Sequence, residues 1–224
     1  MQTPSKLALS FVHTKIVQYG QKRMDFRYMI YGLDKIPQDR KVYITRMNNF
    51  ETLNIFFKQT LRLENVLFGD VWVCSGQSNM EWPLGEILNA EEEIEKMSDY
   101  PNIKMFMLDF MFSDQPQDDL LKDQNFGWES TSNSDAVREF SAVCLLTARF
   151  MADTLGKDKV FGLIESSWGG TVIEAWSTPK GLDNCQIENS NDEEPQLANS
   201  VIYNAMIHPL LKMSIYGVLW YQGT

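Results

Sequence analysis

The chain has 224 residues, 44% of them hydrophobic and 22% charged, which excludes a disordered chain and is typical of an ordinary globular protein with a buried core. Its net charge of −10 argues against nucleic acid or an anionic membrane surface as a partner, because both require a basic surface. No apolar run approaches the roughly 20 residues that span a bilayer, and the N-terminal residues do not resemble a signal peptide.

The first part of the chain, residues 1–66, is expected to be a β-rich segment. Runs of β-branched and aromatic residues between turn signals predict short strands at residues 26–31, 41–45 and 53–57. Short strands with little helical periodicity are typical of an antiparallel sheet or sandwich.

The pattern changes near Gly69, and residues 67–224 are expected to form an α/β domain. Short apolar runs predict buried strands at residues 71–74, 103–108, 160–164 and 215–221. Helices are predicted at residues 86–97, 139–155 and 197–213, and surface loops at residues 109–133 and 184–195. Pro209 would kink or end the last helix. Strands that alternate with helices predict right-handed crossovers and a parallel sheet with helices on its faces.

The chain has few cysteines and histidines, the residues that form disulfide frameworks and many metal sites. Cys74, Cys144 and Cys185 are an odd, widely spread set, which predicts no disulfide framework. With only two histidines in the chain, no metal-ligand spacing is found, and we expect neither a metal nor a cofactor. The absence of an N-x-S/T sequon adds to an expectation of a reducing context.

A serine follows the first strand of the α/β domain at a tight turn. Gly76 permits the turn, and Ser78 would project from it, as a nucleophile does on a sharp strand-to-helix turn. The usual five-residue pattern ends in glycine, whereas Met80 stands there in this chain. The alternative is a turn serine that caps the next helix.

Two more strand ends are polar or rich in glycine, and in parallel sheets such ends meet at one edge. Gly169 and Gly170 follow the third strand, where their N–H groups can face a ligand as an oxyanion hole requires. The alternative is a plain glycine turn before a helix capped by Thr171. Gln222 follows the last strand and can donate its side-chain amide to the same oxygen.

Four motifs occur in the order found in the sialate O-acetylesterases of the SGNH-hydrolase superfamily: GDVWVCSGQSNM (69–80), GLIESSWGGTVIEAWS (162–177), YNAMIHPL (203–210) and GVLWYQG (217–223). The resemblance covers about residues 66–223. It implies part of a three-layer α/β/α hydrolase core that removes acetyl groups from sialic acids or a related acetylated sugar. It also implies that Ser78 is the nucleophile and that Gly169, Gly170 and Gln222 line the oxyanion hole with the Ser78 N–H. Which glycine donates stays open, and Ser75, Ser166 and Ser167 are expected to support the loops.

The general base is the missing part of this site, since a serine nucleophile normally needs a histidine oriented by a carboxylate. In the family this histidine and its aspartate follow the WYQG motif, and this chain ends at Thr224. The resemblance therefore implies a chain that is incomplete and weakly active or inactive. His208 matches a family position that is not the catalytic histidine, and His13 is a weaker candidate still. The alternatives are a non-catalytic carbohydrate-binding relative and activity that depends on His208.

Charged residues of the predicted helices and the apolar last strand give further predictions about the surface of the chain. Arg138 and Arg149 are the basic residues nearest in sequence to the core motifs, and the carboxylates Glu91, Glu92 and Glu93 are expected on a solvated helix face. The last strand, residues 218–221, would leave an exposed apolar edge that invites self-association or a partner. The family has secreted, lysosomal and cytosolic members, so localisation is left open.

Overall fold

Two units make up the chain in the computed structural model, which describes residues 42–47, 50–56, 60–120, 127–183, 185 and 194–223. One unit comprises residues 1–69 with 212–214, and the other comprises residues 70–211 with 215–224. The predicted strand at residues 26–31 lies outside the described residues.

The described part of the first unit is a three-stranded antiparallel sheet in the order β1-β2-β3. Its strands are β1 Val42–Met47, β2 Phe50–Phe56 and β3 Thr60–Val66. The β-rich character predicted for this part of the chain is confirmed here. β3 was not predicted separately, although Leu61 and Leu63 alternate with Arg62 and Glu64 as a strand requires.

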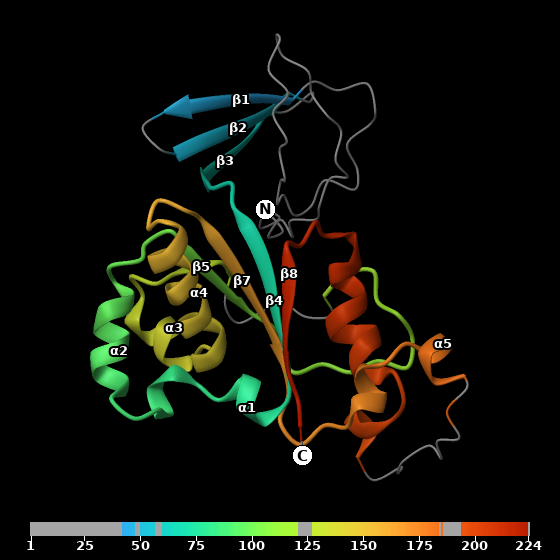
Figure 1. Ribbon diagram of the computed structural model, residues 1–224. Coiled ribbons are helices and arrows are strands. Elements are labelled where there is room, and N and C mark those ends of the chain that lie inside the picture. The colour runs from blue at the N-terminus through green and yellow to red at the C-terminus, as the bar shows by residue number, and fades with distance from the viewer. Residues whose placement is uncertain are drawn as a thin grey trace, which may run out of the picture. The chain divides into compact units, whose positions relative to one another are not determined.

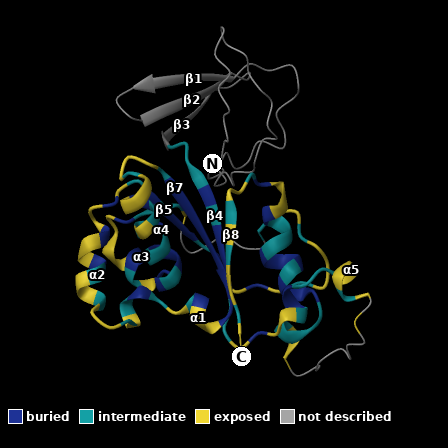
Figure 2. Cartoon of the chain, in the orientation of Figure 1, coloured by how far each residue is buried: buried dark blue, intermediate teal, exposed yellow. Residues whose placement is uncertain are grey.

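The second unit is built on a five-stranded sheet in the order β6-β5-β7-β4-β8 (Figure 1). The strands are β4 Asp70–Gly76, β5 Ile103–Met107, β6 Glu129–Ser130, β7 Phe161–Ser167 and β8 Gly217–Tyr221. All but β6 run parallel, which confirms the predicted parallel sheet. Every residue of β7 is buried, as expected for a strand covered on both faces (Figure 2).

Helices cover both faces of this sheet, so the unit has the three α/β/α layers that were predicted (Figure 1). One face carries α2 Ala90–Met97, α3 Ser134–Glu139 and α4 Ala142–Leu155. The other carries α5 Pro179–Leu182, the π-helical turn η4 Tyr203–Ile207 and the 3₁₀ turn η5 His208–Lys212. Short turns complete the set: α1 Ser78–Glu81, η1 Leu84–Glu86, η2 Ile173–Trp176 and η3 Pro195–Leu197.

The main departures from the predicted helices have local causes. The helix expected at residues 139–155 begins at Ala142, because the Ser141 side chain accepts the Cys144 N–H and so caps α4 at that point. The helix expected at residues 197–213 changes from a π-helical to a 3₁₀ turn next to Pro209, which has no N–H to donate. In the described part of the chain no helix is long and apolar enough to cross a membrane.

The last strand of the sheet, β8, pairs only with β4 among the described strands and therefore forms an edge. Val218, Trp220 and Tyr221 on this strand are exposed. An exposed edge at this strand was predicted from the sequence. Its use by a partner or a second copy stays a prediction.

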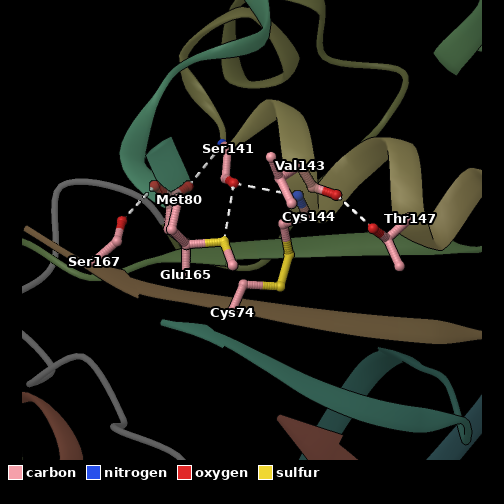
Figure 3. Close-up of a disulfide and its surroundings, with 8 residues drawn as sticks. All are labelled: Cys74, Met80, Ser141, Val143, Cys144, Thr147, Glu165 and Ser167. Atoms are coloured by element: carbon pink, nitrogen blue, oxygen red, sulfur yellow. Dashed lines mark hydrogen bonds between the residues drawn. A yellow bond between two sulfur atoms is a disulfide. The ribbon is translucent and has the colours of Figure 1, made fainter. Parts of the chain in front are cut away.

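A disulfide between Cys74 of β4 and Cys144 of α4 corrects the prediction made from the cysteine count (Figure 3). Both residues are fully buried, and the bond joins the strand that leads to Ser78 to the helix packed on it. The prediction of no disulfide was wrong, because the two cysteines are 70 residues apart and only the packing of α4 against β4 brings them together. The cysteine count therefore no longer supports a reducing context. Cys185 is free and exposed.

Removing this disulfide is expected to destabilise the chain. Replacing Cys74 and Cys144 together by alanine should lower the free energy of unfolding by about 3 kcal/mol, because the cross-link closes a long loop in the unfolded chain. Urea unfolding under non-reducing conditions measures the change. Cys185→Ala, which removes the free cysteine, is the control, and an equal effect of both changes would contradict the prediction.

Candidate active site

Ser78 lies on a sharp turn between β4 and α1, as predicted. It is the first residue of α1, and its side chain is exposed. Gly76 makes the turn with a φ of +141°, and a Cβ atom there would lie 2.1 Å from the Tyr221 carbonyl oxygen. Only glycine fits such a close approach between backbones. The Gln77 N–H donates to the same carbonyl at 3.1 Å, which fixes the turn against the end of β8.

The three strand ends that the sequence predicted to converge do meet. The register places Gly76 opposite Ser167 of β7 on one side and Tyr221 of β8 on the other. A Cβ atom placed on Gly169 would lie 3.3 Å from Ser78 Oγ, so the glycine pair passes directly beside the serine. Gly170 has a φ of +73°, in the left-handed region that glycine favours.

Thr171 ties the loop after β7 to the other two strand ends. Its hydroxyl donates to the Trp168 carbonyl at 2.6 Å and accepts from the Trp176 indole N–H at 2.8 Å. Its carbonyl accepts the side-chain amides of Gln222 at 3.2 Å and of Gln77 at 3.5 Å. Gln222 therefore reaches the glycine loop, and one of its two amide hydrogens is engaged there. Thr171 does not cap η2, whose N-cap residue is Val172.

Glu81 is a site residue that the sequence did not reveal. It lies one turn after Ser78 in α1, and its carboxylate accepts the Gly169 N–H. The same carboxylate oxygen is 3.0 Å from the point where a Gly169 Cβ would be. The signal was the three-residue spacing from Ser78, which places both side chains on the same side of a helical turn.

Glu165 is another carboxyl group of this unit, buried on β7 in the middle layer (Figure 3). Its oxygens accept the Ser141 N–H at 2.8 Å and the Ser167 hydroxyl at 3.0 Å. Burial raises the pKa of Glu165 from 4.5 to about 8, the two hydrogen bonds oppose this rise, and the charge of Glu81 adds to it. The group is therefore mostly protonated at neutral pH.

The other serines near the strand ends are buried. The Ser166 hydroxyl donates to the Met206 carbonyl at 3.2 Å and so joins β7 to η4. Ser167 holds Glu165, and Ser75 is buried on β4. The hydroxyls of Ser166 and Ser167 make contacts of the kind predicted for support of the loops, whereas the Ser75 hydroxyl has no hydrogen-bond partner among the described residues.

His208 has a hydrogen-bond partner at one of its two ring nitrogens. Its Nδ1 lies 2.8 Å from the Gln117 carbonyl oxygen, and its ring packs edge-on against Tyr203. Within the described residues, no hydrogen bond reaches the Ser78 side chain. His13 lies outside the described residues.

Arg138 and Arg149, the basic residues nearest in sequence to the core motifs, form ion pairs with α2. Arg138 pairs with Glu91 at 2.8 Å, and Arg149 pairs with Glu93. The predicted solvated face of α2 is thus partly an ion-pair surface, and the structure does not join either arginine to the strand ends. Across the described parts of the chain, no group of three or more His, Cys, Asp or Glu is placed to hold a metal ion.

Comparisons with known proteins agree with this geometry. The family model described as "Carbohydrate esterase, sialic acid-specific acetylesterase" matches residues 68–224. Sialate O-acetylesterase from Mus musculus is 36% identical over 199 residues, covering 73% of this chain and 36% of the mouse protein. The Homo sapiens enzyme is 39% identical over 173 residues, covering 73% of this chain and 32% of the human protein.

A solved structure gives the same result for the fold. The crystal structure of a carbohydrate acetylesterase from Xanthomonas citri matches with a TM-score of 0.67 and 30% identity, and covers 77% of this chain and 37% of that chain. This chain spans roughly a third of the length of the mouse and human relatives. With the family model matched over most of its length, the chain belongs to the sialic acid-specific acetylesterase family of carbohydrate esterases.

Proposed function

We propose that this chain carries the nucleophile of a serine esterase that removes O-acetyl groups from sialic acids. The observation that carries the proposal is the exposed Ser78 on a glycine-dependent turn, at the point where three strand ends of the sheet meet. Family membership gives the reaction class, and the sialate O-acetylesterases among the relatives suggest the substrate.

In the proposed reaction Ser78 Oγ attacks the acetyl carbonyl carbon while a base takes the hydroxyl proton. The carbonyl oxygen becomes an oxyanion, which N–H donors must stabilise. The Ser78 N–H, an N–H of Gly169 or Gly170 and the amide of Gln222 are the proposed donors. The bond between the acetyl carbon and the sugar oxygen then breaks, the protonated base gives its proton to that oxygen, and the acetyl-serine left behind is hydrolysed by water.

Glu81 occupies one of these donors in the structure, because it accepts the Gly169 N–H. If Gly169 serves the oxyanion, the substrate oxygen must replace the Glu81 carboxylate. Gly170 is the other candidate, and Gln222 keeps one amide hydrogen for the substrate. Which glycine donates stays open.

The proposal does not assign His208 as the base for Ser78, because among the described residues no hydrogen bond joins the His208 ring to the Ser78 side chain. A non-catalytic protein that binds acetylated sugars is the second candidate function. It is favoured by one observation: among the described residues nothing hydrogen-bonds the Ser78 side chain.

Release of acetate from 9-O-acetyl-N-acetylneuraminic acid tests the proposal. We expect the 224-residue chain alone to release acetate at the background rate, because no described group accepts the Ser78 proton. A fusion in which the C-terminal remainder of mouse sialate O-acetylesterase follows Gly223 should release acetate well above background. A folded fusion that binds the sugar without releasing acetate would favour the second candidate, and one that does neither would contradict both.

A further inference from the structure

Two aromatic side chains lie at the carboxyl edge of the sheet and have no part in the proposed reaction. The rings of Phe110 and Trp168 are stacked, with their centroids 4.9 Å apart and an angle of 14° between their planes. Near-parallel rings at this distance have the offset-stacked arrangement that aromatic pairs favour.

The sheet brings the two rings together from separate strands. Phe110 is the third residue after β5, and Trp168 is the first residue after β7. β5 and β7 pair in parallel, and the Leu108 N–H donates to the Glu165 carbonyl at 3.0 Å, which extends the pairing toward the aromatic residues. Both rings therefore belong to the edge at which Ser78 lies.

The backbone of Trp168 is bonded to the turn that carries the proposed nucleophile. Its N–H donates to the Gly76 carbonyl at 3.1 Å, and the next residue is Gly169. Gly169 passes so close to the serine that a Cβ there would be 3.3 Å from Ser78 Oγ. Trp168 of the aromatic pair is therefore the residue next to a glycine that passes beside Ser78.

Phe110 is exposed, and the backbone of Trp168 behind it is held in place. Phe110 is 49% exposed, so a large part of its ring faces solvent although the residue is apolar. The backbone that carries Trp168 is fixed, because its carbonyl accepts the Thr171 hydroxyl, which also accepts the Trp176 indole N–H. A surface fixed before binding loses little entropy when a ligand arrives.

We propose that Phe110, backed by Trp168, is a stacking platform for the sugar ring of the O-acetylated substrate. The inference rests on the proposed function and adds the binding site for the ring. Sugar rings have one face lined with C–H groups, and dispersion and the negative face of an aromatic ring attract such a face. A ring stacked on Phe110 would lie at the same edge of the sheet as Ser78 and keep its hydroxyls accessible to water. Ligand sites commonly combine aromatic walls with a few polar groups in this way.

Binding by the 224-residue chain tests the platform without requiring turnover. Titration calorimetry with the methyl glycoside of 9-O-acetyl-N-acetylneuraminic acid is carried out on the Ser78→Ala background, so that no substrate is consumed. Phe110→Ala is expected to raise Kd about 5- to 10-fold, since a stacked aromatic contact has about this strength. Phe110→Tyr keeps the ring and should leave Kd within about twofold. Phe150→Ala removes a 71% exposed phenylalanine from α4 and should leave Kd unchanged.

The outcomes separate the platform from the esterase proposal. Equal Kd values for Phe110→Ala and Phe150→Ala would overturn the platform, as would the absence of saturable binding by the folded chain. Neither result bears on the reaction, which is decided by acetate release from the fusion. Thermal unfolding of each variant confirms that it is folded, and Phe110→Leu, which keeps an apolar side chain without a ring, distinguishes stacking from general apolar contact.

Discussion

Replacing Ser78 by alanine is expected to lower the acetate-releasing activity of the fusion by a factor of about 10⁴ to 10⁶, because members of a catalytic unit act together. The fold should not change. Ser78 is exposed at the start of α1, its side chain has no hydrogen-bond partner among the described residues, and alanine suits a helix well. The measurements are kcat from acetate release and the thermal unfolding temperature of both proteins.

A serine of the surface serves as the control for this change. Ser98 follows α2, is exposed, and its hydroxyl donates only to the nearby Glu95 carbonyl at 2.8 Å. Ser98→Ala should leave kcat unchanged. If the folded Ser78→Ala fusion kept more than about a tenth of the original kcat, Ser78 would not be the nucleophile. Removal of a serine nucleophile lowers kcat by several orders of magnitude.

The sheet and the meeting of its strand ends could be predicted from the sequence because both depend on local patterns. Apolar runs predicted all four parallel strands, and the requirement for glycine predicted the turn at Gly76. Parallel strands place their carboxyl ends at one edge of the sheet. The sequence therefore predicts that Ser78 and Gly169 lie close together.

The buried polar groups could not be predicted in this way. The strand expected at residues 160–164 continues to Ser167, because Glu165 and Ser166 find hydrogen-bond partners in the layers that cover β7 and the Ser167 hydroxyl donates to Glu165. Those partners come from Ser141 and Met206, more than 20 residues away in sequence. The pairing of Cys74 with Cys144 depends on the same packing of α4. Long-range packing of this kind has no local signature.

Glu165 gives the chain a dependence of stability on pH that follows from its burial. Its pKa in the folded chain is about 8, against 4.5 as its ordinary value. Between these values the unfolded chain has lost the proton while the folded chain keeps it. Stability therefore falls as pH rises from about 4.5 to about 8, and the loss is on the order of 4 kcal/mol. The Glu81 carboxylate strengthens the effect, because its charge disfavours a second charge nearby.

Replacing Glu165 by glutamine is expected to remove this loss. Glutamine has the shape of the protonated carboxyl, so its oxygen can accept the Ser141 N–H and its amide can donate to the Ser167 hydroxyl. Near pH 4.5 the variant and the unchanged chain should unfold at similar urea concentrations, whereas at pH 8.5 the variant should be the more stable one. Glu95→Gln, which makes the same change of net charge at an exposed position of α2, is the control. The stability difference between Glu165→Gln and the unchanged chain could instead stay constant from pH 4.5 to 8.5. Glu165 would then have the same pKa in the folded and the unfolded chain, and burial would not raise it.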